Sequence, residues 1–306
     1  MKNQFIMSKK IKSILVTGVA PMSDHAANRG EKLLGNASSV KRRPDGRVYI
    51  SGQMQRHVLF SAIDRINEDH PERGETYVAN GDAPSTQIDK DLRSDLGGFL
   101  DTKKGDYSGR RTAPISATPA VAINPSSIGR DLLIRLKMDD NTDSNKKQAL
   151  ATNEFSIHDE MIMNFHLDVG VVGVTKKYSY ENEYHVSTTY ESAIDDEEHR
   201  RRIGLFLEGT ASMTDFANQA RNAVSGEPNR VLIVLDNKMS RKAARYFQPE
   251  TTDIERENIL EELTERGAHV FLGDDTTKEG LSVAKAYRLA MEVLSDNELY
   301  RPPYEQ

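Results

Sequence analysis

The chain of 306 residues contains no cysteine and no tryptophan. Without cysteine it has no disulfide, no thiolate metal ligand and no thiol nucleophile. Without tryptophan it lacks the commonest large anchor of carbohydrate and methylammonium sites. No apolar run approaches the roughly 18 residues of a membrane-spanning helix, and no signal-type apolar stretch follows the lysines at 9, 10 and 12. The sequence therefore predicts a cytoplasmic protein without a membrane partner.

Several catalytic motifs are also missing. No glycine-rich loop ends in Lys-Ser or Lys-Thr, and Gly18 and Gly52 do not form a dinucleotide-binding fingerprint. The eight histidines are scattered, and the two groups closest to a metal-ligand pattern are His158-Asp159-Glu160 and His166-x-Asp168. Neither group has the spacing of an established metal site, and a strand places alternate residues on one face in any case. We expect no metal and no cofactor.

Charge is distributed unevenly along the chain. The net charge is −6. Residues 1–57 carry eleven lysines and arginines against three acids, whereas residues 250–306 carry six against fourteen. This asymmetry suits a face that binds a polyanion, or head-to-tail stacking of identical subunits, although a solvated surface with uneven charge explains it equally well.

The apolar pattern predicts an α+β fold. Strands are expected at 13–19, 117–123, 160–173, 230–235 and 268–272, and helices at 54–67, from 200 onward, at 254–266 and at 280–294. The order strand, helix, strand occurs twice, with long insertions, which is typical of a ferredoxin or RNA-recognition (RRM) sandwich. Residues 21–47 are predicted to be a polar loop, and 68–112 an inserted, partly mobile subdomain.

A possible phosphate site lies where a short strand ends at Ser51-Gly52 and a helix begins. Free N–H groups at a helix start favour an anion, although the pattern taken alone favours an ordinary N-cap role for Ser51. Basic and amide side chains in the first turn, in the preceding loop and at the end of the insertion complete a predicted RNA groove. These residues are Ser51, Gln53, Gln55, Arg56, Lys41, Arg42, Arg43, Arg110 and Arg111. The aromatic signature of base-stacking sheets is missing, so we expect contacts to the RNA backbone.

Four stretches resemble the CRISPR-associated DevR group, the repeated backbone subunit of type I Cascade complexes within the repeat-associated mysterious protein (RAMP) superfamily. They are the strand 11–19 with the Asn28-Arg29 loop, residues 47–56, residues 110–123 and residues 216–222.

This resemblance implies an RRM-like palm spanning 1–306, with fingers at 68–158 and a thumb at 203–230 or alternatively 176–199. It implies a non-catalytic subunit that polymerises along the spacer of a guide RNA (crRNA) and presents bases to target DNA, beside other Cascade subunits. The residues Asn28, Arg29, Phe216, Asn218, Gln219 and Arg221 would then join the RNA-binding set.

The chain departs from the family pattern at one point and leaves two alternatives open. Most members have a glycine before the Asn-Gln pair, where this chain has Phe216-Ala217. Phe216 could be a wedge beside an unstacked base, or an ordinary core residue. Related type III subunits cut RNA with an aspartate in an early loop, and Asp24 lies in such a loop. A metal-dependent endoribonuclease and a free-standing RNA-binding regulator are therefore the alternatives.

Overall fold

The structure, a computed structural model, describes residues 10–33, 37–81, 85–100, 110–136, 148–182 and 184–302. Its strands are β1 (Ser13–His25), β2 (Arg29–Leu33), β3 (Ala37–Val40), β4 (Tyr49–Ile50), β5 (Phe99–Leu100), β6 (Arg110–Arg111), β7 (Ile115–Ala117), β8 (Ala120–Ala122), β9 (Ile128–Leu136), β10 (Gln148–Asp168), β11 (Val174–Glu181), β12 (Tyr184–Ser192), β13 (Arg230–Asp236) and β14 (His269–Asp274). Its helices are α1 (Gly52–Asp69), α2 (Leu92–Gly97), α3 (Asp196–Ala211), α4 (Asp253–Glu265) and α5 (Val283–Asp296), with the 3-10 turns η2 (Val169–Val171) and η3 (Lys242–Arg245).

One large sheet organises the part of the chain that the structure describes. Its strands follow the order β14-β13-β1-β10-β3-β2, while β7, β8 and β9 also pair with β10, and β4 pairs with β8. The central strand β1 is antiparallel to both β10 and β13, and the single residue pair between β10 and β3 is parallel. Large antiparallel sheets with helices packed on them are the arrangement that an α+β class predicts.

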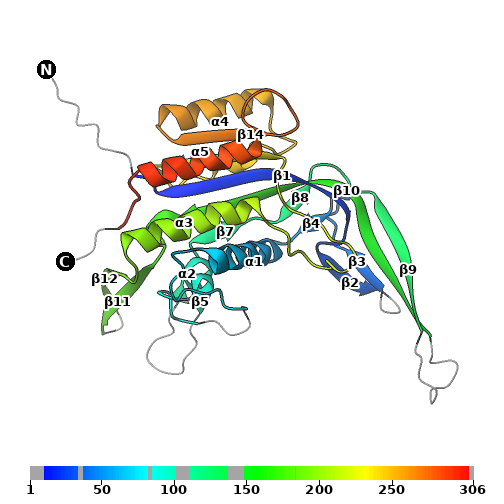
Figure 1. Cartoon of the computed structure of the whole chain (residues 1–306), viewed down its shortest axis with the longest axis horizontal. Helices are drawn as coiled ribbons and strands as arrows, with labels where there is room; N and C mark the ends of the chain where they lie inside the picture. Colours follow the sequence, from blue (N-terminus) through cyan, green and yellow to red (C-terminus); the bar gives the residue numbers. More distant parts are fainter. Residues whose placement is uncertain are drawn as a thin grey trace, which may run out of the picture.

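Helices cover both faces of the sheet. Alternate residues of β1, such as Ile14 and Val16, contact the main core, to which α1, α3 and α5 also contribute. The intervening residue Leu15 lies in a smaller core on the other face, with Leu232 of β13 and Ile259 of α4. Figure 1 shows α1, α3 and α5 side by side along the sheet, with α4 beyond β14. Among the described helices none is long and apolar enough to cross a membrane.

A buried ionic cluster joins the insertion to the sheet. The carboxylate of Asp95 accepts a hydrogen bond from Arg202 (2.6 Å), one from Arg111, and one from the backbone N–H of Gly173 (2.8 Å). Both Asp95 and Arg202 are fully buried. Arg202 also donates to the carbonyl oxygens of Ile88 and Asp89. The cluster therefore fixes α2 against α3 and the turn after β10, and this part of the predicted insertion belongs to the body of the protein.

The sequence predicted four of the five described α-helices and the strands β1, β8, β10, β13 and β14, but not all of their limits. The region 21–47 was predicted to be a loop, and this is wrong, because β1 continues to His25 and β2 and β3 follow it. Beyond Val19, β1 pairs with β10 but no longer with β13, so Pro21 lies where one edge of the strand is open. The helix expected from 200 starts at Asp196, where Asp195 caps it.

Two hairpins project from the body in Figure 1. One is the long pair β9–β10, and the other is β11–β12, which forms a separate two-stranded sheet. The polar stretch 176–199 is thus largely this second hairpin, with Tyr184 and Val186 exposed. By contrast, residues 203–211 lie within α3, where Phe206 and Leu207 are buried in the core.

Candidate nucleic-acid interface

The junction between β4 and α1 has the geometry of an ordinary helix cap. The Oγ of Ser51 accepts a hydrogen bond from the N–H of Met54 (3.3 Å). This confirms the capping role and leaves other N–H groups of the first turn without an intrahelical acceptor. A Cβ on Gly52 would lie 2.8 Å from the carbonyl oxygen of Ala117, so glycine permits the close approach of β7.

The three predicted side chains of the first turn point to different surroundings. Gln53 is exposed, whereas Gln55 is fully buried, and neither atom of its amide has a hydrogen-bond partner among the described residues. Arg56 is half-buried and donates to the carbonyl oxygen of Gly97, and burial lowers the pKa of its guanidinium. The structure therefore leaves Gln53 and Arg56 near solvent and directs Gln55 inward.

A pocket of about 780 Å³ lies beside the start of α1. Its walls come from α1, from α2 and the residues on both sides of it, and from the end of β7. The lining residues are Gly52, Gln53, Arg56, His57, Phe60, Ala79, Asn80, Gly81, Asp91, Arg93, Ser94, Gly97, Gly98 and Ala117. The guanidinium of Arg93 lies 4.9 Å above the ring of Phe60. Two guanidiniums and a helix N-terminus therefore share one concavity, which suits an anion.

Arg93 and Phe60 were missed at the sequence level. Phe60 has the spacing of a core residue on α1, and Arg93 lies in a polar stretch that gives no periodic signal. The contact between them depends on the position of α2, which the buried Asp95 cluster fixes. The cation–π contact between Arg93 and Phe60 therefore depends on the tertiary structure and could not be predicted from the sequence.

The predicted basic residues at 41–43 lie on a tight hairpin that precedes β4. The N–H of Arg43 donates to the carbonyl oxygen of Arg47 (2.9 Å), and that of Gly46 donates back to Arg43 (3.0 Å). Arg42 and Arg43 are exposed and Lys41 is half-buried. Arg47 is engaged by Asp45 at 2.7 Å. The hairpin thus presents Arg42 and Arg43 to solvent.

A buried hydrogen-bond network holds this hairpin at Val48. The Nε2 of His25 lies 2.7 Å from the carboxylate of Asp159, which also accepts from the Oγ of Ser126 (2.5 Å). The same Oγ accepts from the N–H of Val48 (3.0 Å). His25 is therefore held in the interior, whereas the neighbouring Asp24 is exposed.

The loop that follows α3 reaches the same end of the sheet. Asn218 has a φ of 64° and donates to the carbonyl oxygen of Ala26 (2.7 Å). Asn222 donates to the carbonyl oxygen of Asp24 (2.7 Å), and Asn28 donates to that of Tyr49 (2.8 Å). Residues far apart in the sequence, at 24–28, 41–51 and 218–222, are therefore neighbours.

The other predicted residues of this loop have distinct positions. Gln219 donates to the carbonyl oxygens of Thr214 and Val224, so its amide stabilises the loop itself. Phe216 is buried in the core, and a Cβ on Gly226 would lie 2.7 Å from its ring. This position favours the packing role for Phe216 over a wedge beside an unstacked base. Arg221 is exposed.

Of the two arginines at the end of the insertion, only the side chain of Arg111 is described, and it does not contribute to a basic surface. Arg111 donates to the carboxylate and the carbonyl oxygen of Asp95 and to the carbonyl oxygens of Val171 and Val174. Its role in this structure is structural, which is a correction to its place in the predicted groove. The side chains of Arg110 and Arg29 lie outside the described residues. Within the described residues, no group of three or more His, Asp or Glu could hold a metal ion.

Comparison with solved structures defines the class of fold. Over 92% of this chain, a chain titled "CRISPR RNA-guided surveillance complex" matches with a TM-score of 0.55 and 13% identity, over 98% of its own length. A second, titled "CRISPR RNA-guided surveillance complex, pre-nicking", matches with a TM-score of 0.56 and 12% identity, over 92% of this chain and 99% of its own. The fold is therefore that of chains found in such complexes.

The sequence itself assigns the family. The model of the family "CRISPR-associated negative auto-regulator DevR/Csa2" matches residues 16–225, more than half of the chain. The protein belongs to this family, as its four motif-like stretches predicted. No curated protein matches the sequence.

Proposed function

We propose that the protein is a non-catalytic subunit that binds the guide RNA of a type I CRISPR surveillance complex, with several copies along the spacer. Membership of the DevR/Csa2 family supports this proposal. The observation that carries it is the convergence of the exposed Arg42 and Arg43, the Asn218 loop and the start of α1 at one end of the sheet. Such a surface suits a phosphate backbone, while base pairing with target DNA would supply specificity.

The strand order supports an RRM-like palm. The strands β13, β1, β10 and β8 are neighbours in that order, with α1 between β1 and β7 in sequence and α3 between β10 and β13. This is the 4-1-3-2 order of a ferredoxin-like sandwich, to which β14, α4 and α5 are added. Within the predicted fingers, 68–158, the β9–β10 hairpin projects in Figure 1. Of the two ranges predicted for the thumb we favour 176–199, because β11–β12 protrudes whereas 203–211 is buried in α3.

The test is RNA binding by fluorescence anisotropy over a range of salt concentrations. The double variant Arg42→Ala with Arg43→Ala removes two exposed cations, so we expect weaker binding and a salt slope smaller by about 1.4, at about 0.7 per lost phosphate contact with a single strand. The matched control is Lys278→Ala with Lys285→Ala, two exposed cations in the acidic part of the chain. Equal slopes for the two double variants would exclude the proposed surface.

A metal-dependent endoribonuclease using Asp24 is the competing function. Asp24 is exposed and has a φ of 50°, a conformation that asparagine tolerates well. The variant Asp24→Asn therefore removes the charge with little strain. We expect no magnesium-dependent cleavage of bound RNA by the wild-type protein; cleavage that Asp24→Asn abolishes would support the nuclease instead.

A further inference from the structure

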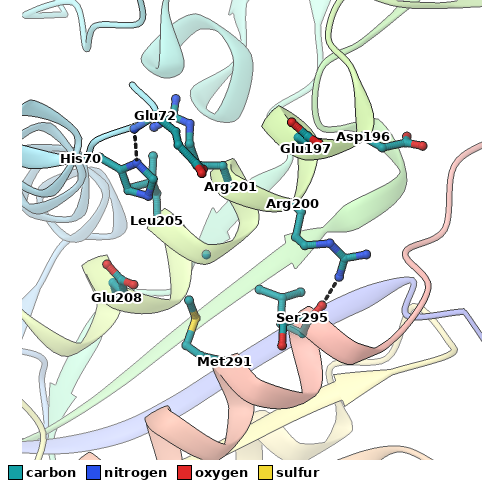
Figure 2. A pocket seen from close by; sticks show the side chains of 12 residues that line it. His70, Glu72, Asp196, Glu197, Arg200, Arg201, Leu205, Glu208, Met291 and Ser295 are labelled. Carbon is teal, nitrogen blue, oxygen red and sulfur yellow. Dashed lines mark hydrogen bonds between the residues drawn. The ribbon is translucent and has the colours of Figure 1, made fainter. Parts of the chain in front are cut away.

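A second groove, of about 440 Å³, lies away from the proposed RNA surface. It runs between α3, α5 and the turn that follows α1 (Figure 2). The lining residues are His70, Glu72, Asp196, Glu197, Arg200, Arg201, Gly204, Leu205, Glu208, Met291, Leu294 and Ser295. Nothing in the proposed function uses this groove.

The floor of the groove is apolar. Leu205 and Leu294 reach it from the core, and Met291 is half-buried between α3 and α5. A Cβ on Gly204 would lie 3.2 Å from the Cε of Met291, which is closer than ordinary contact. Glycine at 204 therefore leaves room for the methionine and keeps the groove open. An apolar floor of this kind favours an occupant with apolar side chains.

The rim of the groove carries uncompensated negative charge. The carboxylates of Glu72, Glu197 and Glu208 are exposed and have no ion-pair partner among the described residues. The two arginines are both engaged. Arg200 donates to the carbonyl oxygens of Leu294 and Asn297. Arg201 is bound by Glu198, Asn67 and Thr76. A cationic occupant would therefore find three available carboxylates.

The chain enters the described structure close to one wall of this groove. The N–H of Ile11 donates to the carbonyl oxygen of Glu298 (2.9 Å), and Ile11 forms a parallel bridge with Leu299. These residues follow directly on the end of α5, where Leu294 and Ser295 line the groove. Nine residues precede Lys10, and at about 3.3 Å per residue they span up to roughly 30 Å. The segment therefore starts beside the groove and is long enough to extend along it.

We propose that residues 1–9 of the same chain dock in this groove. Their sequence, Met-Lys-Asn-Gln-Phe-Ile-Met-Ser-Lys, offers Phe5, Ile6 and Met7 to the apolar floor and Lys2 and Lys9 to the acidic rim. The neighbouring Lys10 already pairs with Glu298 at 3.3 Å, so the same charge complementarity operates at the entry point. In this proposal the groove binds the N-terminal segment, and this docking does not depend on RNA binding.

Cysteine crosslinking tests this docking without background, because the chain has no native cysteine. The test variant combines Gln4→Cys with Ser295→Cys, which preserves every charge and apolar anchor named above. The matched control combines Gln4→Cys with Lys238→Cys. Lys238 is exposed, and its carbonyl oxygen accepts from Ser13, so it is also close to the chain entry but outside the groove lining. We expect intramolecular crosslinking roughly tenfold faster in the test pair, because docking raises the effective concentration.

Two further variants separate docking from a change in folding. Phe5→Ser with Ile6→Ser leaves the groove intact, and Glu72→Lys with Glu208→Lys reverses exposed charges on the rim. Each is expected to slow the Ser295 crosslink to the control rate without lowering the melting temperature. Equal rates in the test and control pairs of the otherwise native chain would overturn the proposal. Crosslinks that join two chains and increase with protein concentration would also overturn it, since the occupant would then be a second copy.

Discussion

At the scale of single residues, the role of each arginine depends on which acceptors the fold places around it. Arg111 and Arg42 look equally suited to RNA in the sequence. In the structure Arg111 is held by Asp95 and backbone carbonyl oxygens, whereas Arg42 is exposed. The acceptors of Arg111 come from α2 and the turn after β10, so no local pattern near residue 111 could have identified them. Burial of a guanidinium is a property of the tertiary structure.

The Asp95 cluster gives a prediction about stability. Asp95→Ala leaves the guanidiniums of Arg111 and Arg202 without their shared carboxylate, so we expect a loss of about 3 to 5 kcal/mol in the free energy of unfolding. The control is Asp89→Ala, whose exposed side chain is nearby and should cost less than about 0.5 kcal/mol. Urea unfolding measures both, and similar losses would contradict a special role for Asp95.

Gln55 gives a prediction of the opposite sign. Its amide is fully buried and unpartnered, which costs free energy that an apolar side chain of similar shape would recover. Gln55→Met should therefore leave the free energy of unfolding unchanged or raise it by up to about 1 kcal/mol. A loss above that size in urea unfolding would show that the amide makes a stabilising contact.

At the scale of elements, periodicity in the sequence predicted helices and strands correctly where the signal is local. The prediction failed where the limits of a strand depend on its pairing with a distant strand. The helix after Ser51 has a local cap signal and a clear apolar face, and it was predicted correctly. The extension of β1 to His25 depends on its pairing with β10, more than a hundred residues away, which overrides the break suggested by Pro21. Only the α1 residues of the pocket beside α1 could be predicted from the sequence. Its other wall includes Arg93 and Gly97 of the insertion, whose position depends on the tertiary structure.

The start of α1 gives a prediction that separates capping from RNA binding. Aspartate caps a helix as well as serine does, so Ser51→Asp should keep the free energy of unfolding within about 0.5 kcal/mol. The new carboxylate would repel a phosphate, and we expect RNA affinity to fall about fivefold, or roughly 1 kcal/mol. Ser51→Ala, by contrast, should cost about 1 kcal/mol of stability. Unchanged RNA affinity in Ser51→Asp would show that no phosphate binds there.

At the scale of the whole molecule, two buried histidines predict acid sensitivity. Burial lowers the pKa of His166 to about 4, helped by the charge of Arg241, and burial likewise lowers that of His199 to about 4. The unfolded chain, with ordinary values near 6.5, takes up these protons first. Stability should therefore be full above about pH 6.5 and fall as the pH drops toward 4, by up to about 3 kcal/mol per histidine. His166→Leu should make this loss shallower in urea unfolding at each pH, and an unchanged profile would contradict the assignment.

The central claim, that several copies assemble along one guide RNA, concerns the whole molecule and is tested most directly by native mass spectrometry. The protein is mixed with RNAs of one sequence type and increasing length, and the mass of each complex gives the number of bound chains. The proposal predicts that this number rises in integer steps with RNA length, giving a ladder of stacked copies. A single bound chain at every RNA length would contradict it and favour the free-standing regulator.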